Sequence, residues 1–512
     1  MYINFEMRIE SLIKIYLFSF FLLPPLNASI QKKAILNKNP LEDKNKIEKI
    51  IKNGSNPSKD IPLVISIDNL KELLITNNKD LSKYKSQINQ SEAILKTKFA
   101  AWYPNFSFTS NELPKFLTGD DIKNSDANTS SNQLRVGVDA NIEWDLIKPE
   151  RRLEIKIARD QLNNNKLLYR SSIEELYLES LKIYYSIQAS YEEINVANKS
   201  IEISNIAYKE ANEKLKSGIG NKLEVLEAKI QLNRDEINLI NKIGNLEKNI
   251  NSLSKLLNIN EQILINQENV KSIKWVWPHT LEDSLLSTYK NRLDLRIKEN
   301  NITINKNKSF SVLSGKKPNF KLYNKFSVST TNGEASVSNP DFSNNTKSNL
   351  NTLGIKFSWN LFDGGLIKQN YFSLKEKTNE LEDDFLQSKS EIKKQLLDTL
   401  INYEIAKKNI VLSFDQLKAA EETLDISLKR MEAGLGTQRE IVNVQADVAE
   451  SESNFINSIT EYNQNLASLE RISLLKKSDI CSKNNYQINN KNKEFYEFLI
   501  KNNLTSSCKE II

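Results

Sequence analysis

Few residues in this chain have the type and spacing that chemistry requires. The one histidine among the 512 residues, His279, follows Pro278. A metal site built from several histidines is therefore excluded, and no Cys-x-x-Cys pair is present to bind zinc. The two cysteines are Cys481 and Cys508. In an oxidising compartment they could pair as a disulfide, or both could remain free thiols.

No motif for phosphate binding or acid–base catalysis emerges either. Gly218-Ile219-Gly220 lacks the third glycine of a dinucleotide-binding loop and does not follow a predicted strand. The adjacent acidic pairs Glu174–Glu175 and Asp383–Asp384 are most simply explained as charges on solvated helix faces. We therefore predict that the protein is not an enzyme and needs no cofactor.

Composition and the N-terminus narrow the class of protein. Hydrophobic residues make up 39% of the chain and the mean hydropathy is −0.50, which excludes a bundle of transmembrane helices. The net charge of +6 comes from 71 basic and 65 acidic groups without a basic stripe, so nucleic-acid binding is not expected. Arg8 and Lys14 precede the apolar run Ile15–Leu23, and Ala28 offers a cleavage site. This pattern indicates a secretory signal peptide, because the run is too short to span a membrane as an anchor.

The chain contains an internal repeat. Trp102-Tyr103-Pro104-Asn105-Phe106 is matched by Lys317-Pro318-Asn319-Phe320, and Ile142-Glu143-Trp144-Asp145-Leu146 is matched by Phe357-Ser358-Trp359-Asn360-Leu361. A repeat of this size means that one structural unit is duplicated.

Each repeat contains a segment in which apolar and polar residues alternate. Between Leu134 and Leu146 every second residue is apolar, and the same holds between Leu353 and Leu361. This period of two predicts strands with one apolar and one polar face. A half-buried sheet of a soluble protein would show the same alternation. The length of the strands and the polar loops between them favour a lipid-facing barrel.

Aromatic residues stand at the strand ends, as they do in the interfacial girdles of membrane barrels. The expected girdle contains Trp102, Tyr103, Trp144, Trp359 and Phe362. The polar side chains of the strands are expected to face a water-filled interior: Arg135, Asp139, Asn141, Glu143, Lys356, Ser358 and Asn360.

A long helical segment follows each strand pair. Residues 151–217 and 366–433 contain neither glycine nor proline, and their apolar residues have helical spacing. At 1.5 Å per residue each helix would be about 100 Å long. The helices are expected to turn back at glycines that tolerate positive φ after a helix end. These tip glycines are Gly218, Gly220, Gly434 and Gly436.

One chain supplies only four strands, which cannot close a barrel. The unpaired backbone groups of two open edges cannot lie in hydrocarbon, so several copies must share one barrel. Two copies would give eight strands and three would give twelve. Eight-stranded barrels are filled by side chains, whereas twelve strands leave a lumen.

With these features the chain resembles the TolC family of outer-membrane efflux and export channels. The resemblance rests on Met431-Glu432-Ala433-Gly434, Thr437 and Ile441-Val442-Asn443-Val444-Gln445-Ala446, with Gly218 and Val225-Leu226-Glu227-Ala228 in the first repeat. It covers about Ile67 to Leu475 and implies a homotrimer with a twelve-stranded β-barrel and a twelve-helix periplasmic tunnel. It also implies docking with an inner-membrane transporter through a periplasmic adaptor (membrane fusion) protein. The channel would lie in the lipid of the outer membrane with its helices in the periplasm.

The resemblance places the gate near the second tip, but the family's residues are only partly present. Two aspartates that line the narrowest ring in the family fall at Asn443 and Ala446, with Asp447 one position beyond. The candidate pore constriction is therefore Asn443, Asp447 and Glu440. A tyrosine and an arginine that latch the gate fall near Leu435 and Gln438, neither of which can play the same role.

The expected organisation follows from these signals. The signal peptide covers residues 1–28 and a flexible arm residues 29–62. The first repeat covers 63–258, with a strand pair at about 104–146, a long helix at 151–217 and a return helix at 221–257. A connector covers 259–279. The second repeat covers 280–475, with strands at about 319–362 and helices at 366–433 and 437–475, and a polar tail covers 476–512.

The expected function is that of an outer-membrane channel-tunnel of a tripartite efflux or type I secretion system, which conducts small molecules or secreted proteins passively. A periplasmic coiled-coil adaptor is the alternative, since it too would have a signal peptide and long helical hairpins. The sequence does not identify the substrate, the pump or the role of the arm and the tail.

Overall fold

The computed structural model describes residues 63–121, 129–261, 263–265, 271–336, 345–479 and 490–505, all of which belong to one compact unit. The expected signal peptide and arm lie outside the described residues, as do Cys481 and Cys508.

The described elements occur twice in the same order. The first set is α3 (Ile67–Asn77), α4 (Lys79–Ala100), β2 (Asn105–Asp121), β3 (Thr129–Ile147), α5 (Arg151–Lys216) and α6 (Lys222–Leu257). The second set is α7 (Leu281–Asn291), α8 (Leu293–Ser314), β6 (Asn319–Ser336), β7 (Thr346–Ser358), α9 (Leu366–Glu432) and α10 (Gln438–Ser473). This order confirms the predicted duplication of a unit of two strands and long helices.

The helix predicted before each strand pair is broken in two. Asn78 separates α3 from α4: its Oδ1 accepts a hydrogen bond from Leu81 N at 2.9 Å, and its Nδ2 donates to Leu256 O at 2.6 Å. It therefore caps α4 and ties the break to the end of α6. In the second repeat Arg292, with extended backbone and its Nε 2.9 Å from Asp294 Oδ2, separates α7 from α8.

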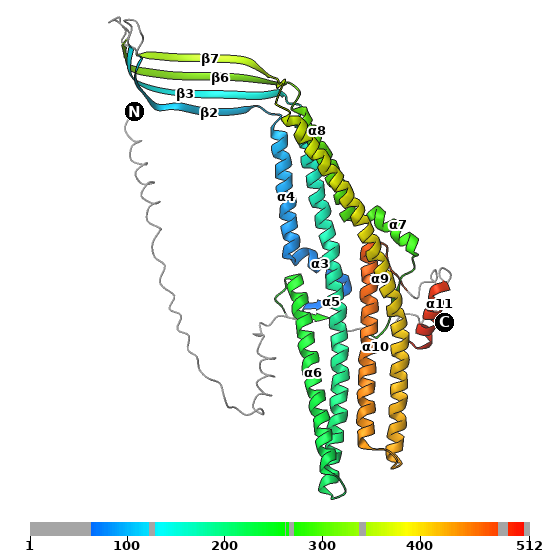
Figure 1. The fold of residues 1–512 in the computed structure, drawn as a ribbon. Coiled ribbons are helices and arrows are strands. Elements are labelled where there is room, and N and C mark those ends of the chain that lie inside the picture. Colours follow the sequence, from blue (N-terminus) through cyan, green and yellow to red (C-terminus); the bar gives the residue numbers. More distant parts are fainter. Residues whose placement is uncertain are drawn as a thin grey trace, which may run out of the picture. The chain divides into compact units, whose positions relative to one another are not determined.

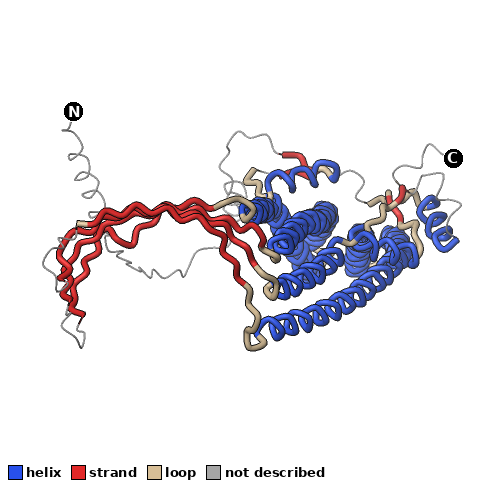
Figure 2. The backbone as a smooth tube through the Cα atoms, turned by 90° about the horizontal axis from the view of Figure 1, so that it is seen from above, coloured by secondary structure: helices blue, strands red, loops and turns tan. Residues whose placement is uncertain are grey.

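The four long strands form one antiparallel sheet in the order β2-β3-β6-β7, so the two repeats join at β3 and β6 (Figures 1 and 2). Trp144 lies opposite Leu322, and Asp145 lies opposite Lys321. This register puts apolar residues on one face and polar residues on the other. β2 and β7 are the two edges of the sheet.

The long helices form two hairpins. α5 packs against α6, α9 packs against α10, and α10 packs against α5, so that α6 and α9 are the outer helices (Figure 1). Closer to the strands, α8 lies between α5 and α9, and α4 packs on α5. Among the described helices, none has an apolar stretch long enough to cross a membrane.

Short elements around the middle of the hairpins hold the connector and the tail. β1 (Leu63–Ile65) pairs in parallel with β4 (Ile263–Ile265), and β5 (Trp275–Val276) pairs with β8 (Ser478–Asp479). The tail, expected to be simply polar, contains α11 (Asn490–Lys501). The apolar face of α11 is buried in the core cluster of α9 and α10 through Phe495, Tyr496 and Leu499.

Truncating the apolar face of α11 should detach the tail. Leu499 is 0% exposed, and replacing a buried leucine by alanine costs about 2–5 kcal/mol. We expect Leu499→Ala to make the tail sensitive to protease and to lower the unfolding midpoint followed by fluorescence of Trp275 and Trp277. Lys501→Ala, at an exposed position of the same helix, is the control. Equal behaviour of the two variants would show that the tail does not stabilise the core.

Candidate functional site

The polar face of the sheet carries ion pairs between the two repeats. Lys325 Nζ lies 2.8 Å from Asp139 Oδ2. Lys321 Nζ donates a hydrogen bond to Glu143 Oε2 at 2.8 Å and lies 3.7 Å from Asp145 Oδ1. The acids come from β3 and the lysines from β6, so these pairs fix the register at the seam between the repeats.

The other residues predicted on this face lie on β3 and β7, except Asn360. Arg135 Nε lies 2.8 Å from Glu112 Oε2 of β2. Asn141 Nδ2 donates a hydrogen bond to Thr109 Oγ1 at 2.9 Å. The remaining predicted residues are exposed: Lys356 and Ser358 on β7, and Asn360. Asn360 lies past the last residue of β7, in the turn towards α9.

The opposite face of the same sheet exposes large apolar side chains. Val138 is 48% exposed and Leu353 is 70% exposed. The exposed apolar residues of this face come from all four strands: Phe106, Phe108, Val136, Val138, Ile142, Phe326, Val328, Leu353, Ile355 and Phe357. No described element covers them, and a contiguous patch of this kind marks an interaction surface.

Two tryptophans at equivalent positions of the repeats hold the ends of the strands. Trp144 Nε1 donates a hydrogen bond to Trp102 O, and Trp359 Nε1 donates one to Lys316 O, both at 2.9 Å. Trp102 and Lys316 each stand two residues before a proline that precedes a strand. The repeat therefore conserves a contact as well as a sequence pattern.

The other predicted aromatic residues lie in the same region. Tyr103 and Phe362 are exposed, Phe362 to 86%. The Arg151 guanidinium lies 4.4 Å from the centre of the Trp102 ring, which favours a cation–π contact. The predicted girdle residues thus lie where strands meet helices.

Glycines shape both hairpin tips. Gly218 has a φ of +75° and Gly434 a φ of +73°, values that favour glycine. The second glycine of each pair lies close to the backbone at the end of the preceding helix. A Cβ at Gly220 would lie 2.6 Å from Leu215 N, and one at Gly436 would lie 3.0 Å from Met431 N. Glycine is therefore favoured at the first position of each tip by its positive φ, and at the second position by the close approach of the backbone.

An ion pair joins the two tips. The Arg439 guanidinium of α10 contacts the Glu227 carboxylate of α6. Arg430 Nε also lies 3.6 Å from Glu440 Oε1 within the second hairpin. A basic residue in the first turn of a helix is unfavourable next to the helix dipole unless it is paired. A basic residue in the first turn of a helix is therefore the sequence signal that could have identified Arg439, the residue after Gln438.

The candidate constriction residues are not gathered at one point. Asn443 lines a hollow between α6 and α10 together with Glu227 and Arg439. Glu440 and Asp447 are not among the residues that line this hollow; Asp447 is exposed and Glu440 lies near Arg430.

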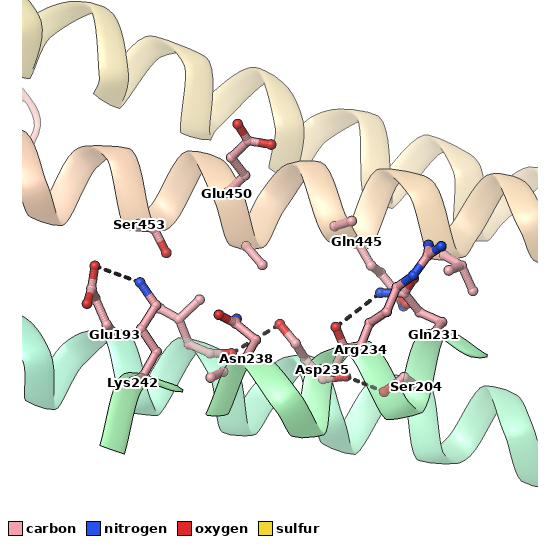
Figure 3. A pocket seen from close by; sticks show the side chains of 16 residues that line it. Glu193, Ser204, Gln231, Arg234, Asp235, Asn238, Lys242, Gln445, Glu450 and Ser453 are labelled. Atoms are coloured by element: carbon pink, nitrogen blue, oxygen red, sulfur yellow. Dashed lines mark hydrogen bonds and ion pairs between the residues drawn. The ribbon is translucent and has the colours of Figure 1, made fainter. Parts of the chain in front are cut away.

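A second, polar hollow separates the hairpins further from the tips (Figure 3). Lys242 Nζ lies 3.0 Å from Glu193 Oε1, and Gln231 Nε2 donates a hydrogen bond to Asp235 Oδ1 at 3.0 Å. Burial raises the pKa of Asp235, although hydrogen bonds from Ser204 and Gln231 favour its charged form. Within the described residues, no group of three His, Cys, Asp or Glu side chains could hold a metal ion.

A comparison with protein families identifies the fold. The model of the family described as outer membrane efflux protein matches residues 70–258 and 321–473, more than half of the chain. The chain belongs to the outer membrane efflux protein family. This outer membrane efflux protein therefore lies in the outer membrane, with its helical part in the periplasm.

Solved structures of outer-membrane channels share the fold. The Campylobacter jejuni CmeC outer membrane channel is 14% identical with a TM-score of 0.64, over 88% of this chain and 93% of that one. VceC from Vibrio cholerae is 13% identical with a TM-score of 0.63, over 79% and 95%. The open state of the Neisseria gonorrhoeae MtrE channel is 13% identical with a TM-score of 0.60, over 79% and 88%. Among curated proteins, no relative matches this outer membrane efflux protein.

The family match covers two separate parts of this outer membrane efflux protein. It stops at residue 258, resumes at 321 and ends at 473. The connector with β5 and the tail with α11 are therefore not part of the matched family pattern.

Proposed function

We propose that the protein is the outer-membrane channel-tunnel of a tripartite efflux or type I secretion system and that it works as a homotrimer. It conducts solutes or secreted proteins passively and does no chemistry itself. The observation that carries this proposal is a sheet with one exposed apolar face and two open edges, β2 and β7.

Open edges require further copies of the chain. In hydrocarbon every backbone N–H and C=O needs a partner within the protein. β2 starts next to α4 and runs away from the helices, whereas β7 returns towards α9. The β7 strand of one copy is therefore antiparallel to the β2 strand of the next, which is the arrangement of membrane barrels. Three copies give twelve strands, enough for a water-filled lumen.

The outer helices support the same assembly. Both expose large apolar residues away from the hollow between α6 and α10: Leu226, Ile237 and Ile240 on α6, and Ile401, Ile405, Leu412 and Ile426 on α9. In the proposed trimer α9 of one copy packs against α6 of the next, as coiled-coil seams do. The helices then continue the wall of the barrel as a periplasmic tunnel.

In this assembly one face of the sheet contacts lipid and the other contacts water. The apolar face contacts lipid, with Trp102, Tyr103, Trp144, Trp359 and Phe362 as its interfacial girdle. The polar face, with its pairs of Asp139 and Glu143, lines the lumen. Arg135, Asn141, Lys356 and Ser358 line it as well, and Asn360 lies at its periplasmic rim.

The gate lies at the hairpin tips. The contact of Arg439 with Glu227 joins the two hairpins of one copy, so opening must separate these groups. Release requires a partner from outside the chain. We infer that this partner is a periplasmic adaptor docked with an inner-membrane transporter.

Asn443 is proposed to line the pore next to this contact. A carboxylate there would attract cations, so Asn443→Asp should raise cation over anion permeability several-fold, whereas Asp447→Ala should lower it. The reversal potential of single channels under a salt gradient measures both effects. Unchanged reversal potentials in both variants would exclude the two residues from the pore.

The proposal is tested by reconstituting the purified protein in planar bilayers. We expect discrete conductance steps that require the assembled protein, and the absence of any step would reject a channel. A deletion strain then separates the two transport routes: sensitivity to toxic small molecules indicates efflux, and loss of secreted proteins indicates secretion.

A further inference from the structure

The connector between the repeats carries a lysine that contacts both hairpins. Lys271 Nζ lies 2.6 Å from Glu452 Oε1 on α10 and 3.5 Å from Glu192 Oε2 on α5. Lys199 Nζ of α5 lies 3.6 Å from the same oxygen of Glu452. The Glu452 side chain is only 14% exposed, so water and salt screen this cluster less than a surface pair.

Lys271 is charged throughout the physiological range. Burial disfavours its ammonium form, but the hydrogen bond and charge of Glu452, together with Glu192, outweigh burial and raise its pKa. The cluster therefore keeps one shared cation between carboxylates of the two hairpins.

The cluster lies at the border between the packed part of the hairpins and the polar hollow. Further from the tips, Gln464 Nε2 donates hydrogen bonds to Lys182 O and Ser186 Oγ, both at 3.0 Å. Val196 and Ile456 are buried together next to the cluster. Closer to the tips lies the polar hollow of Figure 3, and beyond it the contact between the tips.

The tail fixes the position of the connector. Ile273 N donates a hydrogen bond to Leu504 O at 2.8 Å, and β5 pairs with β8. Tyr462 Oη donates to Trp275 O at 2.8 Å, and Trp277 N donates to Tyr403 Oη at 3.1 Å. Lys271 is thus two residues away from a segment that is anchored to α9, α10 and the tail.

We propose that the connector and the tail form a clamp, residues 271–279, 478–479 and 490–504, in which Lys271 is a positioning residue that sets the separation of the hairpins. The clamp holds the tips in the closed position. This proposal rests on the proposed function, in which the tips separate to open the channel.

Removing the charge of Lys271 does more than delete an attraction. Glu192 and Glu452 both contact the same nitrogen, so without it only the longer contact of Lys199 with Glu452, at 3.6 Å, offsets the repulsion between these two carboxylates of different hairpins. Like charges then push α5 and α10 apart. A small change of angle at this level becomes a larger displacement at the tips, because the helices below it are long and separated by the hollow.

The separation of the tips can be measured directly by pulsed electron paramagnetic resonance on the full-length protein. Spin labels are placed at Ile219→Cys and Leu435→Cys, which are 81% and 74% exposed, after Cys481→Ser and Cys508→Ser. We expect Lys271→Met to increase the population of long tip-to-tip distances about tenfold. Lys271→Gln, which keeps a hydrogen-bond donor, should give the same shift and replaces Lys271→Met if that variant does not fold.

Three further variants separate positioning from a general loss of structure. Lys271→Arg should keep the original distances. Lys271→Met with Glu192→Gln should restore them, because the repulsion between the carboxylates is removed. Lys274→Met is the matched control, since Lys274 lies in the same connector over the Trp275 ring, 5.0 Å from its centre.

The clamp is overturned if Lys271→Met and Lys271→Gln keep the original distances, or if Lys274→Met shifts them equally. Conductance measurements distinguish an incorrect clamp proposal from an incorrect channel proposal. If Arg439→Glu opens the channel while the Lys271 variants leave the distances unchanged, the channel stands and the clamp is wrong. Shifted distances in a protein that never conducts would support the clamp and reject the channel.

Discussion

Val138→Arg should prevent assembly of the protein in the outer membrane. Val138 is at the centre of β3 on the apolar face, paired with Val328 of β6. If this face contacts lipid, an arginine near the middle of the bilayer costs about 2–4 kcal/mol in each copy. Three copies bear this cost together, which is comparable to the whole stability of many proteins. The measurement is the yield of assembled protein after refolding into lipid vesicles.

The matched control is Asn141→Arg, three residues along the same strand on the polar face. An arginine there would project into water, so it should lose little more than the hydrogen bond to Thr109. If Val138→Arg assembles as well as Asn141→Arg, the apolar face does not contact lipid, and another partner must cover it.

Arg439→Glu should open the channel at rest. The substitution replaces an attraction to Glu227 by a repulsion at the contact between the tips. The side chains of Arg439 and Glu227 are 66% and 35% exposed, so a single contact contributes about 1 kcal/mol or less. Reversing its sign in three copies at once should raise the open fraction about tenfold or more. Conductance at low salt is the measurement, because salt screens exposed charges.

Two further variants identify the cause of this opening. The charge swap, Arg439→Glu with Glu227→Arg, should close the channel again. Lys429→Glu changes the charge of the same tip but disturbs a pair with Asp425 of its own helix, 2.5 Å away, and should leave the channel closed. Equal opening by Lys429→Glu, or failure of the swap to close the channel, would contradict a latch between these two residues.

The fold could be predicted from the sequence wherever a local pattern specifies it. The alternation from Leu134 to Leu146 predicted a strand with two faces, and β3 has them. The paired glycines predicted both turns between the long helices, because positive φ and close backbone approach are properties of single residues. The duplicated order of elements followed from the repeated motifs.

Features that depend on distant residues could not be predicted in this way. The break at Asn78 depends on its hydrogen bond to Leu256 O, far along the chain. The buried face of α11 lies in a segment whose overall composition is polar, and only the core of α9 and α10 makes its apolar residues informative. The tip contact joins Glu227 to Arg439, which come from different repeats. The girdle, lumen and constriction residues remain predictions, because their roles depend on copies of the chain and on lipid.

The proposed channel depends most directly on the number of copies of the chain in one particle. One chain supplies a sheet of four long strands with two open edges, which cannot close a barrel by itself. We predict that native mass spectrometry of the purified protein in detergent gives three chains per particle. A single folded chain that stays soluble in buffer without detergent would contradict the account.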